Sequence, residues 1–233
     1  MTGIDPEERL RRLAAESLAA DDPTGWFERA YAGCEDDTAV VPWDLPTPQR
    51  LLVEWAEARD LNGAGRRALV VGCGLGRDAE YVARLGFDTV AFDISETAVR
   101  VARQRYPNSP VQYLTADLLD PPSDWREAFD LVVESITVQA LPQQVRRDAI
   151  VQVGQLVASG GTLIVIAAAR DEEDVPVEGP PWPLTRAEVE SFGVGHLEPV
   201  LIEDIRDVPE PGDRRWRAEF RRPEPASCDG VGP

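Results

Sequence analysis

The region from Arg67 to Ala168 alternates short apolar, β-branched runs with stretches of helical periodicity, and this alternation constrains the fold more than any other feature. Strand-like runs occupy residues 67–71, 88–92, 111–115, 129–134 and 162–168, and helical patterns occupy residues 77–85, 96–105 and 143–157. Such strands form parallel sheets with helices on both faces, and right-handed crossovers wind the sheet in both directions. The sequence therefore predicts an α/β fold with a doubly wound, mostly parallel, Rossmann-like sheet.

The segments on either side extend this core. Helical spacing predicts helices over residues 6–20, 26–31 and 51–58, with a proline-interrupted loop over 40–48. Thr185 and Glu188 have the spacing of a capping box for a helix over 185–192. Two further strand-like runs, 197–205 and 216–221, predict a hairpin that adds an antiparallel edge and gives seven strands in all.

The length of 233 residues suits one such domain. We expect it to span residues 1–222. Its parts would be an N-terminal helical lid segment (1–60), a central ligand-binding core (66–170) and a substrate-side loop with the C-terminal hairpin (171–222), followed by a flexible tail (223–233).

The composition limits the partners and the location. A net charge of −18 opposes phosphate backbones and anionic lipid surfaces, so we expect no nucleic acid and no membrane as partners. Cys34, Cys73 and Cys228 are too scattered for a disulfide framework, which fits the reducing cytoplasm, and no set of residues has metal-ligand spacing. Neither a signal peptide nor a membrane span is evident. The pattern fits a monomer or a homodimer.

A glycine-rich turn follows the first core strand. Gly72, Gly74 and Gly76 stand between the apolar run 67–71 and the next helical pattern. Glycines permit a sharp turn that brings backbone N–H groups against a ligand, and the helix N-terminus adds positive potential. Asp93 closes the next strand 21 residues after Gly72, where a carboxylate can accept hydrogen bonds from both hydroxyls of a ribose. These residues predict a nucleotide-type site.

The glycine spacing does not favour a dinucleotide, because that fingerprint has its third glycine five residues after the first, where this chain has Arg77. With Asp93 and Asp117 in register, the chain from Leu69 to Ala168 instead resembles the class I S-adenosylmethionine-dependent methyltransferases. The resemblance implies S-adenosylmethionine as cofactor and S-adenosylhomocysteine as product. The chain departs from that family at Val70, where an acid often contacts the methionine end.

The resemblance also implies the cofactor contacts. In that family the glycine loop lies under the methionine part, the acid after the second strand holds the ribose, and the aspartate after the third strand faces the adenine. The residues so placed are Tyr31, Trp43, Gly72, Cys73, Gly74, Gly76, Asp78, Asp93, Ile94, Asp117, Leu118 and Glu134. Trp26, Tyr31 and Trp43 would form an aromatic lid that attracts the sulfonium, or would pack as core residues.

Several motifs are similar to the thiopurine, thiocyanate and halide methyltransferase branch. They are the Trp-Asp among the prolines of segment 42–48, the Gly-Cys-Gly loop 72–78, the Asp-Ile-Ser at 93–95, the Ala-Leu-Pro at 140–142 and the proline-rich segment 179–185. The last of these resembles the substrate-side loop of that branch and contains Trp182. The likeness supports the branch without identifying its substrate.

The chemistry of methyl transfer favours a soft acceptor. Alignment of the two reactants supplies most of the rate, and a thiolate or halide needs no protein base, whereas a hydroxyl usually does. No base is evident, because His196 lies far along the chain from the expected site. Glu134, Ser135 and Trp182 are the acceptor-side candidates, with helix capping or solvation as the alternative for Glu134 and Ser135.

We therefore predict an enzyme that methylates a small molecule, such as a thiol or another soft nucleophile. One alternative is an O- or N-methyltransferase acting on a natural product or an amine. Another is a non-catalytic S-adenosylmethionine-binding regulatory protein.

Overall fold

A single seven-stranded sheet forms the centre of the computed structural model, which describes residues 5–35, 41–174, 177, 179–193, 196–206 and 214–224. The strands are β1 (Arg67–Val71), β2 (Asp88–Asp93), β3 (Gln112–Thr115), β4 (Phe129–Ser135), β5 (Val157–Ala168), β6 (Glu198–Ile205) and β7 (Arg215–Arg221). Their order is β3-β2-β1-β4-β5-β7-β6. The first five are parallel and β7 is antiparallel to both neighbours, so the predicted fold class is confirmed.

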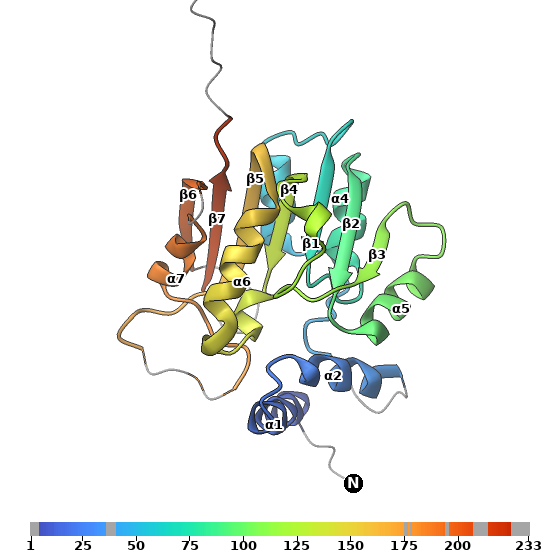
Figure 1. Ribbon diagram of the computed structural model, residues 1–233, viewed down its shortest axis with the longest axis vertical. Coiled ribbons are helices and arrows are strands. Elements are labelled where there is room, and N and C mark those ends of the chain that lie inside the picture. Colours follow the sequence, from blue (N-terminus) through green and yellow to red (C-terminus); the bar gives the residue numbers. More distant parts are fainter. Residues whose placement is uncertain are drawn as a thin grey trace, which may run out of the picture.

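Helices cover both faces of the sheet, as predicted (Figure 1). They are α1 (Pro6–Ala19), α2 (Gly25–Glu35), α3 (Arg50–Glu57), α4 (Arg77–Arg84), α5 (Glu96–Arg105), α6 (Gln143–Leu156) and α7 (Arg186–Glu190). Apolar side chains of α3, α4 and α5 pack on one face, and those of α6 and α7 pack on the other. The chain order reverses beside β1, where β2 and β4 flank it, and open α/β sheets bind ligands at such a point.

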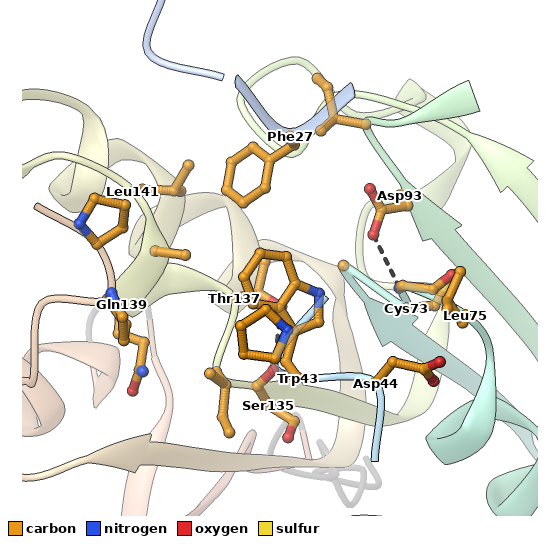
Figure 2. A pocket seen from close by; sticks show the side chains of 18 of the residues that line it. Phe27, Trp43, Asp44, Cys73, Leu75, Asp93, Ser135, Thr137, Gln139 and Leu141 are labelled. Atoms are coloured by element: carbon orange, nitrogen blue, oxygen red, sulfur yellow. Dashed lines mark hydrogen bonds between the residues drawn. The ribbon is translucent and has the colours of Figure 1, made fainter. Parts of the chain in front are cut away.

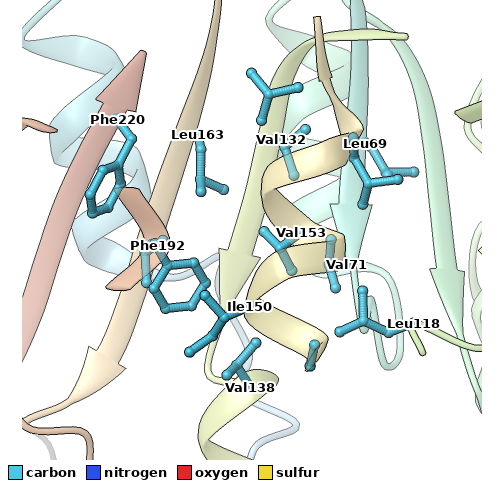
Figure 3. Packing of buried hydrophobic residues seen from close by; sticks show 14 of the residues in the cluster. Leu69, Val71, Leu118, Val132, Val138, Ile150, Val153, Leu163, Phe192 and Phe220 are labelled. Atoms are coloured by element: carbon cyan, nitrogen blue, oxygen red, sulfur yellow. The ribbon is translucent and has the colours of Figure 1, made fainter. Parts of the chain in front are cut away.

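The core on the α6 face is continuous from the parallel strands to the C-terminal hairpin. Figure 3 shows Ile150 and Val153 of α6 in one cluster with Val132 of β4 and Leu163 of β5. Nearby, the rings of Phe192 and Phe220 lie 6.3 Å apart between centroids. The hairpin is therefore packed into the same hydrophobic core as the nucleotide-type half of the sheet.

The helices α1 and α2 lie beyond the carboxyl ends of the parallel strands (Figure 1). Arg29 of α2 donates to the carbonyl of Leu13 in α1 at 2.9 Å. Glu28 accepts hydrogen bonds from the hydroxyls of Ser95 and Thr97, both at 2.6 Å, at the start of α5. These bonds hold the N-terminal helices over the edge of the sheet at which ligands bind.

The ends of several elements test the sequence patterns. Thr185 caps α7, and its hydroxyl accepts from the backbone N–H of Glu188 at 3.2 Å while the Glu188 carboxylate accepts from Thr185 N–H at 2.9 Å, so the predicted capping box is confirmed. The predicted start of the fifth strand at 162 was wrong, because β5 begins at Val157, directly after α6. Residues 41–49 form no helix or strand, as predicted, whereas Val40, the 209–213 turn and the tail from 225 lie outside the described residues.

No helix in the described part of the chain is both long and apolar enough to span a bilayer.

Candidate active site

A cavity of about 670 Å³ opens at the carboxyl edge of the parallel strands, beneath α1 and α2. Its volume falls in the ~300–1,000 Å³ range of small-molecule sites. Most of the residues predicted from the sequence line it: Tyr31, Trp43, Gly72, Cys73, Gly74, Gly76, Asp78, Asp93, Ile94, Asp117, Leu118 and Ser135. Glu134 and Trp182 are not among the lining residues. Figure 2 shows the side chains of Trp43, Asp93, Ser135 and Gln139 around this space.

The glycine loop after β1 has a conformation that requires its glycines. Gly72, Gly74 and Gly76 have φ angles of 58°, 50° and 90°, all in the left-handed region. A Cβ on Gly74 would also lie 2.8 Å from the hydroxyl of Tyr31, and a Cβ on Gly76 would collide with the hydroxyl of Tyr113. Backbone N–H groups can therefore approach a ligand closely only while these positions remain glycine.

Asp93 joins the glycine loop to the end of β2. Its Oδ2 accepts from the backbone N–H of Gly74 and its Oδ1 from that of Ser95, each at 2.9 Å. Burial raises the pKa of Asp93 to about 6, although the hydrogen bonds from Ser95 and Gly74 oppose this shift. A carboxylate has about four acceptor positions, so beside the backbone hydrogen bonds from Gly74, Ser95 and Ile94 there is still room for a ligand hydroxyl in the cavity.

Two further aspartates shape the cavity wall. Asp117 accepts from the backbone N–H of Leu119 at 2.8 Å, which fixes the turn after β3 beside Leu118. Asp78, in the first turn of α4, accepts from the backbone N–H of Gln49 at 2.7 Å. Burial raises the pKa of Asp78, against the hydrogen bonds from Gln49 and Ser135. Asp78 thus ties the segment before α3 to the glycine loop.

The three aromatic residues expected to form a lid or to pack in the core lie together at the cavity. Trp43 donates from Nε1 to the hydroxyl of Tyr31 at 2.8 Å, and both side chains line the cavity beside the glycine loop. Trp26 meets Trp43 edge to face, with centroids 6.2 Å apart, but it is 2% exposed and packs with Leu10 and Ala14. Trp26 therefore belongs to the core cluster of α1 and α2 and also lines the cavity beside Trp43.

An ion-pair cluster that the sequence did not predict holds this lid in place. The carboxylate of Asp44 forms ion pairs with Nη2 of Arg77, from α4, at 2.7 Å and with Nη1 of Arg105, from α5, at 2.9 Å. Burial raises the pKa of Asp44, but the hydrogen bonds from Arg105 and Arg77 outweigh it and lower the pKa overall. No local pattern marks these arginines as partners, because they are far from Asp44 along the chain.

Gln139 connects the centre of the cavity to its acceptor side, and the sequence reasoning missed it although it precedes the Ala-Leu-Pro motif. Its side-chain Oε1 accepts from the backbone N–H of Ala168 at 2.5 Å, at the end of β5. Its backbone carbonyl accepts from Trp182 N–H at 2.8 Å. The proline segment lines the cavity with Pro180, Pro181 and Pro183.

Trp182, expected on the acceptor side, does not line the cavity, and the guanidinium of Arg146 lies 5.9 Å from its ring centroid. Arg146 also pairs with Glu188 at 2.6 Å and donates to the carbonyl of Leu141 at 3.0 Å. The pair of Arg146 and Glu188 thus fastens the proline segment and α7 to the start of α6.

Two other predicted residues also lie away from the cavity. Glu134, expected among the cofactor and acceptor contacts, is 1% exposed and does not line the cavity, and its carboxylate accepts backbone hydrogen bonds from the following turn. His196, at the turn before β6, does not line the cavity. Burial raises the pKa of the Cys73 thiol well above its usual value, which keeps it neutral in the glycine loop.

The donor set suits an adenosyl ligand. Asp93 offers acceptor positions for ribose hydroxyls, and Ile94 and Leu118 flank the cavity beside Asp117. The left-handed glycine turn leaves backbone room for the chain of an amino acid, and Tyr31 and Trp43 border the same space. In the described part of the chain, no group of histidine, cysteine and carboxylate residues could hold a metal ion.

Comparison with known proteins agrees with this geometry. A family model described as a methyltransferase domain matches residues 68–161. The chain is 29% identical over 194 residues to the probable thiol methyltransferase 2 of Arabidopsis thaliana, covering 82% of this chain and 79% of that protein. It is 28% identical over 181 residues to thiocyanate methyltransferase 1 of Brassica oleracea, covering 77% and 74%.

A solved structure shares the fold. The N-methyltransferase NodS from Bradyrhizobium japonicum WM9, in complex with S-adenosylhomocysteine, matches with a TM-score of 0.63 at 23% identity, covering 83% of this chain and 98% of that one. Sheet order, cavity position, family match and relatives all agree. The chain thus carries a methyltransferase domain of the S-adenosylmethionine-dependent kind over residues 68–161, and it resembles the thiol and thiocyanate methyltransferases.

Proposed function

We propose that the acceptor is a small thiol or another soft nucleophile that reaches the site already as an anion. The observation that carries this proposal is the make-up of the acceptor-side wall, formed by α1, the turn after β4, the end of β5 and the proline segment. Among its described residues there is no histidine, and its one carboxylate, Glu7, is ion-paired with Arg11 at 2.9 Å. A hydroxyl acceptor would lack a base there, whereas a thiolate needs none.

The charge on this wall supports an anionic acceptor. Arg11 from α1 and Arg215 from the start of β7 both line the cavity, and Arg215 is 8% exposed. The other lining residues in this region are mainly apolar, including Phe27, Leu141 and Pro181. The guanidinium of the buried Arg215 favours a nearby negative charge more strongly than it would in water, whereas Arg11 is half exposed and already paired with Glu7.

The same proposal gives the cofactor-side residues their roles. When bound, S-adenosylmethionine supplies a methyl group made electrophilic by the sulfonium. Asp93 would accept from the ribose hydroxyls, and Asp117 with Leu118 would border the adenine. The glycine loop would lie under the methionine part, with Tyr31 and Trp43 over the sulfonium. The chain's part is then to align the nucleophile with the methyl carbon and to exclude water.

The wider setting is part of the proposal as well. The domain spans residues 1–222, and the enzyme works in the cytoplasm as a monomer or homodimer. The net charge of −18 supports a small-molecule acceptor over a nucleic acid.

A panel of matched acceptors tests the proposal. The purified protein is incubated with S-adenosylmethionine and with thiophenol, phenol, benzylamine, thiocyanate or iodide, and S-adenosylhomocysteine is measured by chromatography. Thiophenol and phenol have nearly the same shape, so their comparison isolates the nucleophilic atom. We expect turnover with thiophenol or thiocyanate to exceed that with phenol by about 100-fold or more, the size typical of one general base.

Turnover with phenol or benzylamine while the thiol and the anions stay silent would assign the enzyme to the O- or N-methyltransferases. Tight binding of S-adenosylhomocysteine without turnover of any acceptor would revive the regulatory alternative.

A further inference from the structure

The turn after β4 holds a β-branched residue in a conformation that such residues avoid. Ile136 has a φ of 63°, in the left-handed region. Its side chain lines the cavity, and its backbone N–H donates to the carbonyl of Ile166 at 2.8 Å. Isoleucine is rare in this region because its Cβ branches crowd the backbone, so neighbouring groups must hold it there.

The carboxylate of Glu134 is placed to do this. Glu134 lies in the centre of the sheet, paired with Val71 of β1 and Val165 of β5. Its Oε1 accepts from the backbone N–H of Thr137 at 2.9 Å and from that of Val138 at 2.8 Å. These two bonds close the turn directly after Ile136, and a buried carboxylate is costly unless it is hydrogen-bonded.

The other oxygen of Glu134 makes the arrangement unusual. It is buried, and no described residue forms a hydrogen bond with it. Burial raises the pKa of Glu134 to about 7, against the hydrogen bonds from Val138 and Thr137. A single acceptor oxygen therefore does all the hydrogen bonding seen for this side chain, and an amide oxygen has the same capacity.

The turn transmits its position to the glycine loop through Thr137. The Thr137 hydroxyl donates to the carbonyl of Val71 at 3.1 Å, next to the loop. Its side chain also fills the space that a Cβ on Gly72 would take. A shift of Thr137 would thus remove both a contact and a hydrogen bond from the first residues of the loop.

We propose that Glu134 is a positioning residue for cofactor binding, which acts through the turn without touching the cofactor. Its carboxylate holds Ile136 in the left-handed conformation and so presses Thr137 against the Gly72 turn. This role depends on an acceptor oxygen at position 134 and on the strain at position 136. It is independent of which acceptor the enzyme methylates.

The test measures binding of S-adenosylhomocysteine by calorimetry in variants that separate the acceptor oxygen from the strain. We expect Glu134→Ala to weaken binding about tenfold, the size of one lost net hydrogen bond. Glu134→Gln keeps an acceptor oxygen, so its affinity should stay within about threefold of the wild type. Glycine adopts the left-handed conformation freely, so the double variant Glu134→Ala/Ile136→Gly should regain most of the affinity.

A matched control separates this local rescue from general stabilisation. Glu127 also has a left-handed φ, 52°, in an exposed turn away from the cavity. Adding Glu127→Gly to Glu134→Ala should leave binding weak. Circular dichroism confirms that each variant is folded.

Three results would overturn the proposal. Wild-type affinity in Glu134→Ala would show that the turn keeps its position without the Glu134 carboxylate. Equal loss in Glu134→Gln and Glu134→Ala would assign the effect to charge, as in a direct contact with the cofactor. Failure of Ile136→Gly to rescue, in folded protein, would show that strain at that residue plays no part.

Discussion

Asp93 accepts a hydrogen bond from the backbone N–H of Gly74 at 2.9 Å, which makes the carboxylate after β2 and the glycine loop after β1 one rigid unit. The ribose and the methionine part of the cofactor would contact the two sides of this unit. Removing the carboxylate therefore costs a direct ligand contact and an anchor of the loop.

We expect Asp93→Ala to weaken binding of S-adenosylhomocysteine at least about 100-fold, since charge-assisted hydrogen bonds contribute about 1.5–3 kcal/mol each. Isothermal titration calorimetry measures the loss. Titration with NAD, which neither protein should bind, serves as the ligand control. Unchanged affinity in folded Asp93→Ala would place the ribose elsewhere.

Cofactor affinity should also depend on pH through Asp93, whose pKa burial raises to about 6. Ribose hydroxyls donate to the charged form, so binding favours the carboxylate and is lost as the pH falls through 6. A drop from pH 7 to pH 5 should weaken binding about tenfold for a single group with this pKa. Glu134 titrates near pH 7, so the profile is measured by calorimetry in Glu134→Gln. A flat profile would contradict the role of Asp93.

Alanine substitutions at two glycines separate backbone strain from contact with the lid. Gly74 and Gly65 both have left-handed φ angles, 50° and 74°, but an added Cβ meets Tyr31 only at Gly74 and open space at Gly65. We expect each substitution to lower the free energy of unfolding by about 1–2 kcal/mol, measured by urea denaturation. Only Gly74→Ala should also weaken S-adenosylhomocysteine binding, by roughly tenfold or more. Equal binding by both variants would contradict the tight packing of Tyr31 on the loop.

The ion pairs of Asp44 with Arg77 and Arg105 should slow release of the cofactor. We expect Asp44→Asn to speed dissociation of S-adenosylhomocysteine about threefold to tenfold, the effect of losing partly exposed ion pairs of about 1 kcal/mol. Stopped-flow displacement at about 0.05 and 0.5 M salt measures the rate, which should rise with salt in the wild type more than in the variant.

Asp204→Asn is the matched control for Asp44→Asn. Asp204 lies on β6, outside the cavity lining, and forms a similar ion-pair cluster with Arg214 and Arg206. Its dissociation rate should equal that of the wild type. A similar acceleration in both variants would attribute the effect to net charge instead of the lid.

Removing Glu188 should destabilise the protein strongly, because it leaves the guanidinium of Arg146 buried without its partner. We expect Glu188→Ala to lower the free energy of unfolding by about 3 kcal/mol or more, as when one member of a buried pair is lost. Glu190→Ala breaks an exposed ion pair with Arg186 in the same helix and should change the free energy of unfolding by less than about 0.5 kcal/mol. Both variants are measured by thermal and urea unfolding. Equal losses of stability in Glu188→Ala and Glu190→Ala would show that the buried pair contributes no more than the exposed one.

The sequence predicts the sheet well because apolar runs and helical spacing are local signals. All seven strands lie where the pattern indicates, apart from β5, whose first residues, 157–161, precede the expected start and do not form a continuous apolar run. The glycine loop and Asp93 were equally predictable, since strand ends in parallel sheets meet at one edge.

Side-chain direction and long-range pairing were not predictable from local patterns. The end of β4 was located correctly, but nothing in the sequence tells that Glu134 turns into the following loop and away from the cavity. Trp182 lies near the site in the fold, yet its ring turns toward Arg146. The partners of Asp44 lie 33 and 61 residues away, so only the tertiary fold brings them together.

The place of β7 between β5 and β6 has a consequence for how the chain is made. Residues 163–166 of β5 are apolar and fully covered, and β7, which pairs with them, is synthesised about 50 residues later. Until then this edge offers unpaired backbone groups to any neighbouring chain, which is the usual starting point for edge-to-edge aggregation. Nascent or truncated chains that stop before Arg215 should therefore be the species that chaperones retain, whereas the finished protein presents β6 as its edge.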